Sequence, residues 1–193
     1  MWTKRLKPIL FLLFFSGTSA SAEALLQSVD FVGYAGGYSL SGRTASNRSV
    51  SLSGFGSYSG QLEAGVGGHY RASAGINYLI SNGFTGDTAW GFHFGMKYFP
   101  FSWNGVKENE FAGVSWSLVD QFRPFVGVTM KTLQFTTVLS SSYNGVGVSA
   151  GTHYTLTSQY YLSGEFQYNL LSGNNNNSLT EMSGLLGFGI RFR

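Results

Sequence analysis

The sequence contains no cysteine, only three prolines and few charged residues, which make up 11% of its 193 residues. Without cysteine the chain forms no disulfide and no thiol-based metal or redox site, and it cannot carry the lipidated cysteine of a lipoprotein. After the N-terminal region, no apolar run reaches the ~20 residues that a membrane-spanning helix requires. If the mature chain enters a membrane, it does so as strands.

The N-terminal region has the three parts of a secretory signal peptide: a basic segment, a short apolar run and a stretch of small residues. These parts are Lys4, Arg5 and Lys7, then residues 9–15, then a stretch ending in the A-x-A cleavage pattern Ala20-Ser21-Ala22. The apolar run is too short for an anchoring helix. We therefore expect residues 1–22 to be cleaved and residues 23–193 to form one domain.

Removal of the signal peptide changes the charge balance. The precursor has a net charge of +3, but all three charged residues of the signal are basic, which leaves nine Lys and Arg residues against nine Asp and Glu. The mature chain is formally neutral. Its charge therefore gives no reason to expect nucleic acid as a partner.

Eight segments of the mature chain alternate between bulky apolar residues and small or polar ones, which indicates strands. In the last of them, Leu186, Phe188 and Ile190 share one face, and Gly187 and Gly189 lie on the other. In the first, Val32, Tyr34, Tyr38 and Leu40 form the bulky face. The eight predicted strands cover residues 29–40, 58–70, 73–81, 89–101, 122–138, 146–156, 159–171 and 181–192.

The connections between these segments suggest a meander. Tyr143-Asn144-Gly145 predicts a hairpin turn, and residues 156–159 predict a tight reversal. The longer polar connections are 41–57, 81–88 and 172–181. An even number of strands places both termini at one end, as in a transmembrane meander.

The misfit in this scheme is segment 101–121, which is long for a connection at the terminal end of the barrel. Part of it, residues 111–119, itself alternates like a strand. If that part and residues 48–55 both cross the membrane, the barrel has ten strands; we expect eight.

The small and polar faces also carry most of the charge, which identifies the face that lines the lumen. An eight-stranded barrel is just wide enough for side chains to fill it, so small residues suit its interior. The bulky faces, the first strand's included, should then contact lipid; in a soluble sandwich the exposed face would be richer in Lys and Glu. Aromatic residues near strand ends should form the interfacial girdles. These are Tyr34, Tyr38, Tyr70, Trp90, Tyr98, Phe99, Tyr154, Tyr168, Phe188 and Phe192.

The aromatic-rich segment 182–192 resembles the closing strand of bacterial outer-membrane β-barrels, although Arg193 follows Phe192 where such chains commonly end on the aromatic residue. Across residues 29–192 the chain resembles small barrels of the OmpA and OmpX type without a periplasmic domain. The resemblance implies an all-β, antiparallel up-and-down barrel in the outer membrane of Gram-negative bacteria. It also implies outer-membrane lipids and, through the C-terminal strand, the barrel-assembly machinery as partners, with loops available to a surface ligand.

Polar side chains on the inner face are the candidate site residues. An isolated charge in a narrow lumen is costly, so we expect the charges to pair and to plug the barrel. The ion-pair candidates are Glu63, Lys97, Lys131, Glu165 and Arg191. The other polar candidates are His69, Asn77, His93, His153, Gln167 and Asn169.

These residues favour a non-enzymatic protein with a structural or surface-interacting role. The first alternative is a small pore or a carrier for a small or apolar solute. A third reading is a lipid hydrolase, in which His153, Thr155 and Glu165 would imitate a Ser-His-acid triad with threonine in place of the expected serine. We expect no cofactor, and no metal, because the three histidines show no ligand spacing.

Overall fold

The computed structural model describes residues 26–43, 49–66, 68–80, 88–100, 110–111, 114–115, 121–136, 142–173 and 177–192. The predicted cleavage site after Ala22 lies outside them. No helix among these residues is long and apolar enough to cross a membrane. The strands are β1 (Leu26–Arg43), β2 (Ser49–Val66), β3 (Tyr70–Ile80), β4 (Thr88–Tyr98), β5 (Glu110–Phe111), β6 (Val114–Ser115), β7 (Phe122–Phe135), β8 (Ser142–Thr155), β9 (Tyr160–Gly173) and β10 (Ser178–Phe192).

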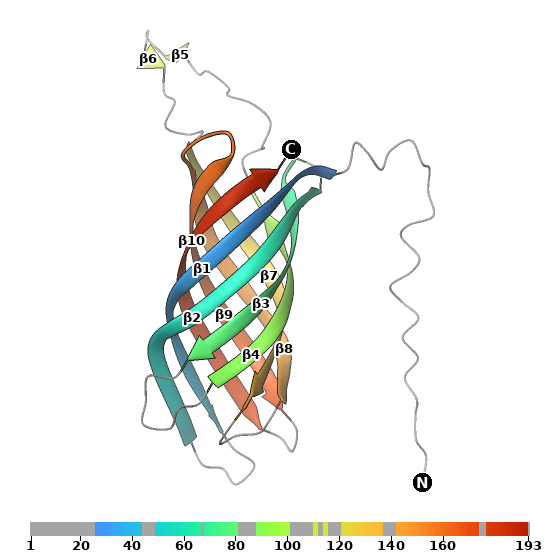
Figure 1. The fold of residues 1–193 in the computed structure, drawn as a ribbon, viewed down its shortest axis with the longest axis vertical. Helices are drawn as coiled ribbons and strands as arrows, with labels where there is room; N and C mark the ends of the chain where they lie inside the picture. Colours follow the sequence, from blue (N-terminus) through green and yellow to red (C-terminus); the bar gives the residue numbers. More distant parts are fainter. Residues whose placement is uncertain are drawn as a thin grey trace, which may run out of the picture.

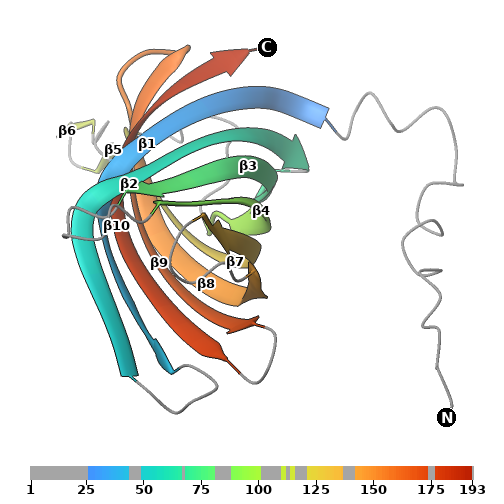
Figure 2. The same cartoon turned by 60° about the horizontal axis from the view of Figure 1, so that its bottom comes forward.

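Eight strands close into one antiparallel barrel in the order β1-β10-β9-β8-β7-β4-β3-β2 (Figures 1 and 2). The start of β1 and the end of β10 lie at the same end, which we call the terminal end; the opposite end is the loop end (Figure 1). The prediction of eight strands is confirmed. The ten-strand alternative is wrong, because β5 and β6 pair in a separate two-stranded sheet and residues 49–55 belong to β2.

A β-bulge explains why residues 41–57 resembled a loop in the sequence. The β1–β2 register shifts between Gly36 and Tyr38, opposite Gly54 and Ser57. A bulge adds a residue to one strand and reverses the inward and outward positions that follow. Phe55, at the bulge, is 87% exposed. The alternation is therefore broken inside β2, although the strand itself continues.

The hairpin turn predicted at residues 143–145 is wrong, because these residues lie within β8. Gly145 serves a close approach between strands instead of a turn. A Cβ atom there would collide with the backbone of Leu170 and Leu171 on β9. The reversal at residues 156–159 is confirmed: the backbone N–H groups of Leu156 and Thr157 donate to the carbonyl of Tyr160 at 2.9 and 3.1 Å.

The outward placement of the predicted bulky faces is confirmed on seven of the eight barrel strands, whereas their inner faces are polar in the middle and apolar at the loop end. Outward residues on these strands include Phe94 and Leu186, whose exposed fractions are 61% and 77%. For β1 the prediction is wrong, since its bulky face is buried in the lumen. Three predicted girdle residues, Tyr34, Tyr38 and Phe99, are likewise buried inside the barrel.

Inward aromatic rings fit because glycines on facing strands leave room for them. A Cβ atom added to Gly187 would lie 2.5 Å from the ring of Tyr34, and one added to Gly189 would overlap the ring of Tyr161. Aromatic rings on one strand and glycines on the facing strand thus fill the interior together. A close-packed lumen therefore does not require small residues on every strand.

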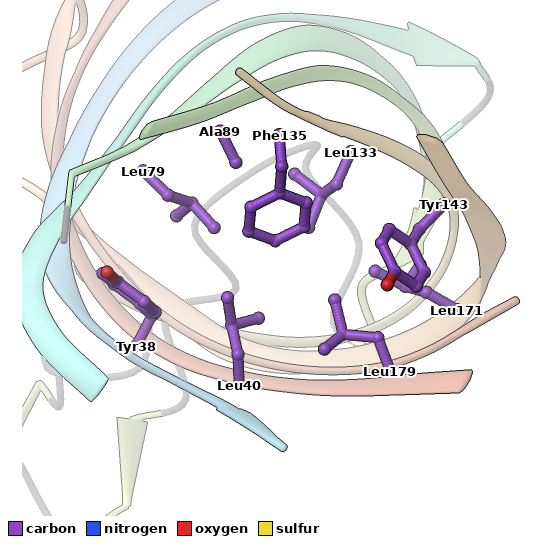
Figure 3. Packing of buried hydrophobic residues seen from close by; sticks show 9 residues of the cluster. All are labelled: Tyr38, Leu40, Leu79, Ala89, Leu133, Phe135, Tyr143, Leu171 and Leu179. Atoms are coloured by element: carbon purple, nitrogen blue, oxygen red, sulfur yellow. The ribbon is translucent and has the colours of Figure 1, made fainter. Parts of the chain in front are cut away.

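The filled interior has three layers along the barrel. The layer at the loop end is apolar, and its residues come from strands around the ring and point into one shared space (Figure 3). Charged residues occupy the middle. Aromatic residues from strands β7, β8 and β9, together with Phe99, pack at the terminal end. The apolar layer consists of Tyr38, Leu40, Leu79, Ala89, Leu133, Phe135, Tyr143, Leu171 and Leu179, with Leu52 packed against it.

Candidate functional site

The middle of the lumen contains a balanced set of buried charges. Among the described residues, four carboxylates and four cationic side chains are buried. Each of them contacts at least one group of opposite charge. Because an unpaired charge in a low-dielectric interior is costly, this balance is what allows the lumen to be filled. The eight residues are Asp30, Glu63, Glu165 and Glu181 with Arg71, Lys97, Lys131 and Arg191.

Lys97 on β4 is the centre of this set. Its Nζ atom lies 2.8 Å from Oε1 of Glu63 on β2 and 2.7 Å from Oε2 of Glu165 on β9. The ammonium group also lies 4.5 Å from the ring centroid of Phe125, within cation–π range. One cation therefore connects three non-adjacent strands, β2, β4 and β9, across the lumen.

A second group of charges extends from Glu63 toward the terminal end. Arg71 contacts Asp30 and lies 3.2 Å from Glu63, and it donates a hydrogen bond of 2.7 Å to Ser28. Arg191 on β10 lies 3.4 Å from Asp30 on β1. These contacts join the first and last strands across the closure of the barrel.

A chain of neutral groups extends from Glu63 toward the loop end. The Gln61 amide donates to Glu63 at 2.6 Å, and the Gln61 carbonyl lies 2.9 Å from Nε2 of His93. The Asn77 amide lies 2.9 Å from Nδ1 of His93. Because an amide nitrogen can only donate, this network assigns the neutral imidazole with its proton on Nε2.

A separate smaller network lies beneath the apolar layer. Lys131 on β7 lies 2.6 Å from Glu181 on β10. Asn169 donates to Glu181 at 3.3 Å and accepts from the Thr129 hydroxyl at 3.0 Å. The pair is thus held by Asn169 of β9, which is itself held by Thr129 of β7.

Two of the predicted polar residues lie apart from these networks. His153 packs in the aromatic layer, 4.5 Å from the ring of Tyr161 and 5.1 Å from the ring of Phe125. His69 lies in the turn between β2 and β3, where its Nδ1 is 2.9 Å from the Phe99 carbonyl. The predicted placement of His69 in the lumen is therefore wrong. The prediction assumed that the strand continued to residue 70, but β2 ends at Val66.

Three of the buried charges were not among the predicted site residues. Asp30 shares the inner face of β1 with Val32 and Tyr34. A carboxylate on that face was the signal that β1 is inverted, since an acid is costly in lipid. Arg71 lay in the gap between two predicted strands, and Glu181 lay at the edge of a predicted loop.

The arrangement does not support the hydrolase reading. Glu165, the acid of the hypothetical triad, is held by Lys97 and by the Gln167 amide at 3.0 Å. His153 packs against the rings of Phe99, Phe125 and Tyr161. In the described part of the chain, no three His, Asp or Glu side chains are grouped to hold a metal ion.

No protein-family model matches the sequence, and neither does any curated protein. Solved structures of bacterial outer-membrane barrels match the fold. Neisserial surface protein A has 12% identity and a TM-score of 0.57, covering 86% of this chain and 100% of its own. The outer membrane protein OprG from Pseudomonas aeruginosa has 12% identity and a TM-score of 0.52, covering 86% and 97%.

The N-terminal β-barrel domain of OprF from Pseudomonas aeruginosa has 13% identity and a TM-score of 0.51, covering 86% of this chain and 100% of its own. At such low identity the likeness concerns the fold. This chain therefore has the all-β, closed, eight-stranded antiparallel fold of small bacterial outer-membrane barrels.

Proposed function

We propose that this chain is a non-enzymatic, integral outer-membrane protein whose barrel is plugged and which has a structural or surface-interacting role. The observation that carries the proposal is the reversed polarity of the barrel. Apolar side chains cover its outer face, whereas the eight buried charges face the lumen and pair there. That distribution suits a barrel surrounded by lipid and is unfavourable for one surrounded by water.

Two features support a plugged lumen. The charges connect non-adjacent strands across the lumen, as Lys97 does between β2 and β9. At the loop end, Leu40, Leu133 and Phe135 belong to the apolar layer and are at most 5% exposed. A layer of this kind excludes water and hydrated ions. We infer that the barrel holds its loops at the cell surface, and that strand β10 is the segment recognised by the barrel-assembly machinery.

Single-cysteine labelling tests location and topology, because the natural chain has no cysteine. We expect a membrane-impermeant maleimide added to whole cells to label Ser49→Cys at the loop end. Ser158→Cys, in the reversal at the terminal end, should be labelled only after the outer membrane is permeabilised. Both residues are exposed, so accessibility in the folded barrel is matched. Labelling of Ser158→Cys alone on intact cells would invert the orientation, and a soluble periplasmic product would refute membrane insertion.

The second candidate is a carrier or pore for a small apolar solute, and the apolar layer favours it. Leucine and aromatic side chains lining the loop end of the lumen would be compatible with such a solute. Planar-bilayer recordings separate the candidates. The plugged barrel should show no stable ion conductance, and the double variant Leu40→Ala, Leu179→Ala should show more than the natural chain. A stable natural conductance that is abolished by bulkier residues at these positions would favour the pore.

A further inference from the structure

A hollow interrupts the outer face of the barrel on strands β7 and β8. It has a volume of about 790 Å³ and an almost entirely apolar lining. That volume falls within the ~300–1,000 Å³ typical of small-molecule sites. Its outward floor includes Val128 on β7 and the pair Val146 and Val148 on β8.

The register shows that this hollow is a furrow with defined walls. Val128 pairs with Val148, and Val148 pairs with Tyr168 on β9. On the other side, Phe94 of β4 forms the opposite wall. The walls stand three strand spacings apart, or about 14 Å, with Val128 and Met130 of β7 and Val146 and Val148 of β8 between them. The furrow therefore follows the two floor strands.

The loop-side end of the furrow is polar but uncharged. The next outward pair toward the loop end is Thr132 and Asn144. Thr132 accepts a hydrogen bond of 3.0 Å from the backbone of Phe92, while Asn144 is exposed. An exposed amide can donate to an ester carbonyl and accept from a hydroxyl. The apolar floor thus leads to a neutral hydrogen-bonding group.

We propose that this furrow binds one acyl chain of a bilayer lipid, with the ester linkage of that chain at Asn144. The inference rests on the proposed membrane insertion, because hydrocarbon chains then surround this face. A slender chain can lie lengthwise over Val146 and Val148 and contact the wall formed by Tyr168 and Leu170 on β9. In lipid, van der Waals packing drives such an association. A second copy related by a two-fold axis at this face would place its own hollow against this one. The space between the two copies would then stay unfilled.

Photo-crosslinking in vesicles of phosphatidylcholine tests this inference. A trace of phosphatidylcholine with a diazirine in one acyl chain is photolysed, and the labelled peptides are quantified by mass spectrometry. Strand β1 lies opposite β7 in the ring and β2 lies opposite β8, so β1 and β2 provide the internal reference. We expect several-fold more label on β7 and β8 than on β1 and β2.

Two matched variants complete the experiment. Val148→Phe fills the floor of the furrow and should remove the enrichment, whereas Ala64→Phe, on the outer face of β2, should preserve it. Heat-modifiable gel mobility shows whether both variants fold. The comparison of label on β7 and β8 with label on β1 and β2 uses the natural chain and does not depend on either variant. Equal labelling of both faces would overturn the furrow site. Absence of label from every strand would instead refute membrane insertion.

Discussion

Replacing Lys97 by methionine should lower the free energy of unfolding by about 3–5 kcal/mol, the largest loss we expect from a single substitution in this barrel. Lys97 is 2% exposed and is the shared cation of Glu63 and Glu165. Methionine would fill similar space but leave two carboxylates together without that cation. Glu63 would retain its contact with Arg71 at 3.2 Å, whereas Glu165 would keep, among the described residues, a neutral donor in the Gln167 amide.

Denaturant unfolding of the barrel in lipid vesicles measures this loss. Arg43→Met is the control, because Arg43 is exposed at the loop end of β1 and its replacement should change stability by less than about 0.5 kcal/mol. The triple variant Lys97→Met, Glu63→Gln, Glu165→Gln should recover part of the loss, since no carboxylate remains unpaired at that point. Equal effects of Lys97→Met and Arg43→Met would contradict the buried network. An unchanged stability with a new ion conductance would make Lys97 a gate.

Replacing Phe94 by lysine should cost about 2–4 kcal/mol if the site lies near the bilayer midplane. Phe94 is near the centre of β4, faces outward and is 61% exposed in the absence of lipid. In a membrane that exposed surface contacts hydrocarbon, where an ammonium group is poorly solvated. A soluble barrel would instead present the same residue to water, and lysine there would be tolerated or even favourable.

The same unfolding assay distinguishes these cases. Ser178→Lys, at the exposed loop end of β10, should be nearly neutral. Phe94→Leu should retain most of the stability, which would show that the cost of lysine comes from its charge and not from loss of the aromatic ring. If Phe94→Lys and Ser178→Lys were equally tolerated, the outer face would not be a lipid face.

Alternation alone determined much of this fold. A strand turns successive side chains to opposite faces, so a period of two specifies both the strand and its inner residues without knowledge of its neighbours. On β4, Trp90, Phe92 and Phe94 therefore face outward and Lys97 inward, as the sequence indicated. The same logic placed Glu63, Lys131, Glu165 and Arg191 in the lumen.

Tertiary structure decided which bulky face points outward on β1. Val32 and Tyr34 are as apolar as lipid-facing residues, and only their neighbours explain their burial. Gly187 on β10 makes room for the ring of Tyr34, and the bulge at Phe55 lets β2 remain paired beyond Gly36. The sequence-based assignment assumed that small residues line the lumen on every strand. It therefore could not foresee that a glycine on one strand makes room for a large side chain on the next.

Tertiary structure also decided the contacts among the charges. The sequence by itself determined that acids and bases share the lumen, because parity is a local property of each strand. Which acid meets which base depends on the closure of the barrel and on the stagger of its strands, which bring Lys97 to Glu63 and Glu165 while Lys131 reaches Glu181. Stagger accumulates over all eight strands around the ring, so no single segment encodes it.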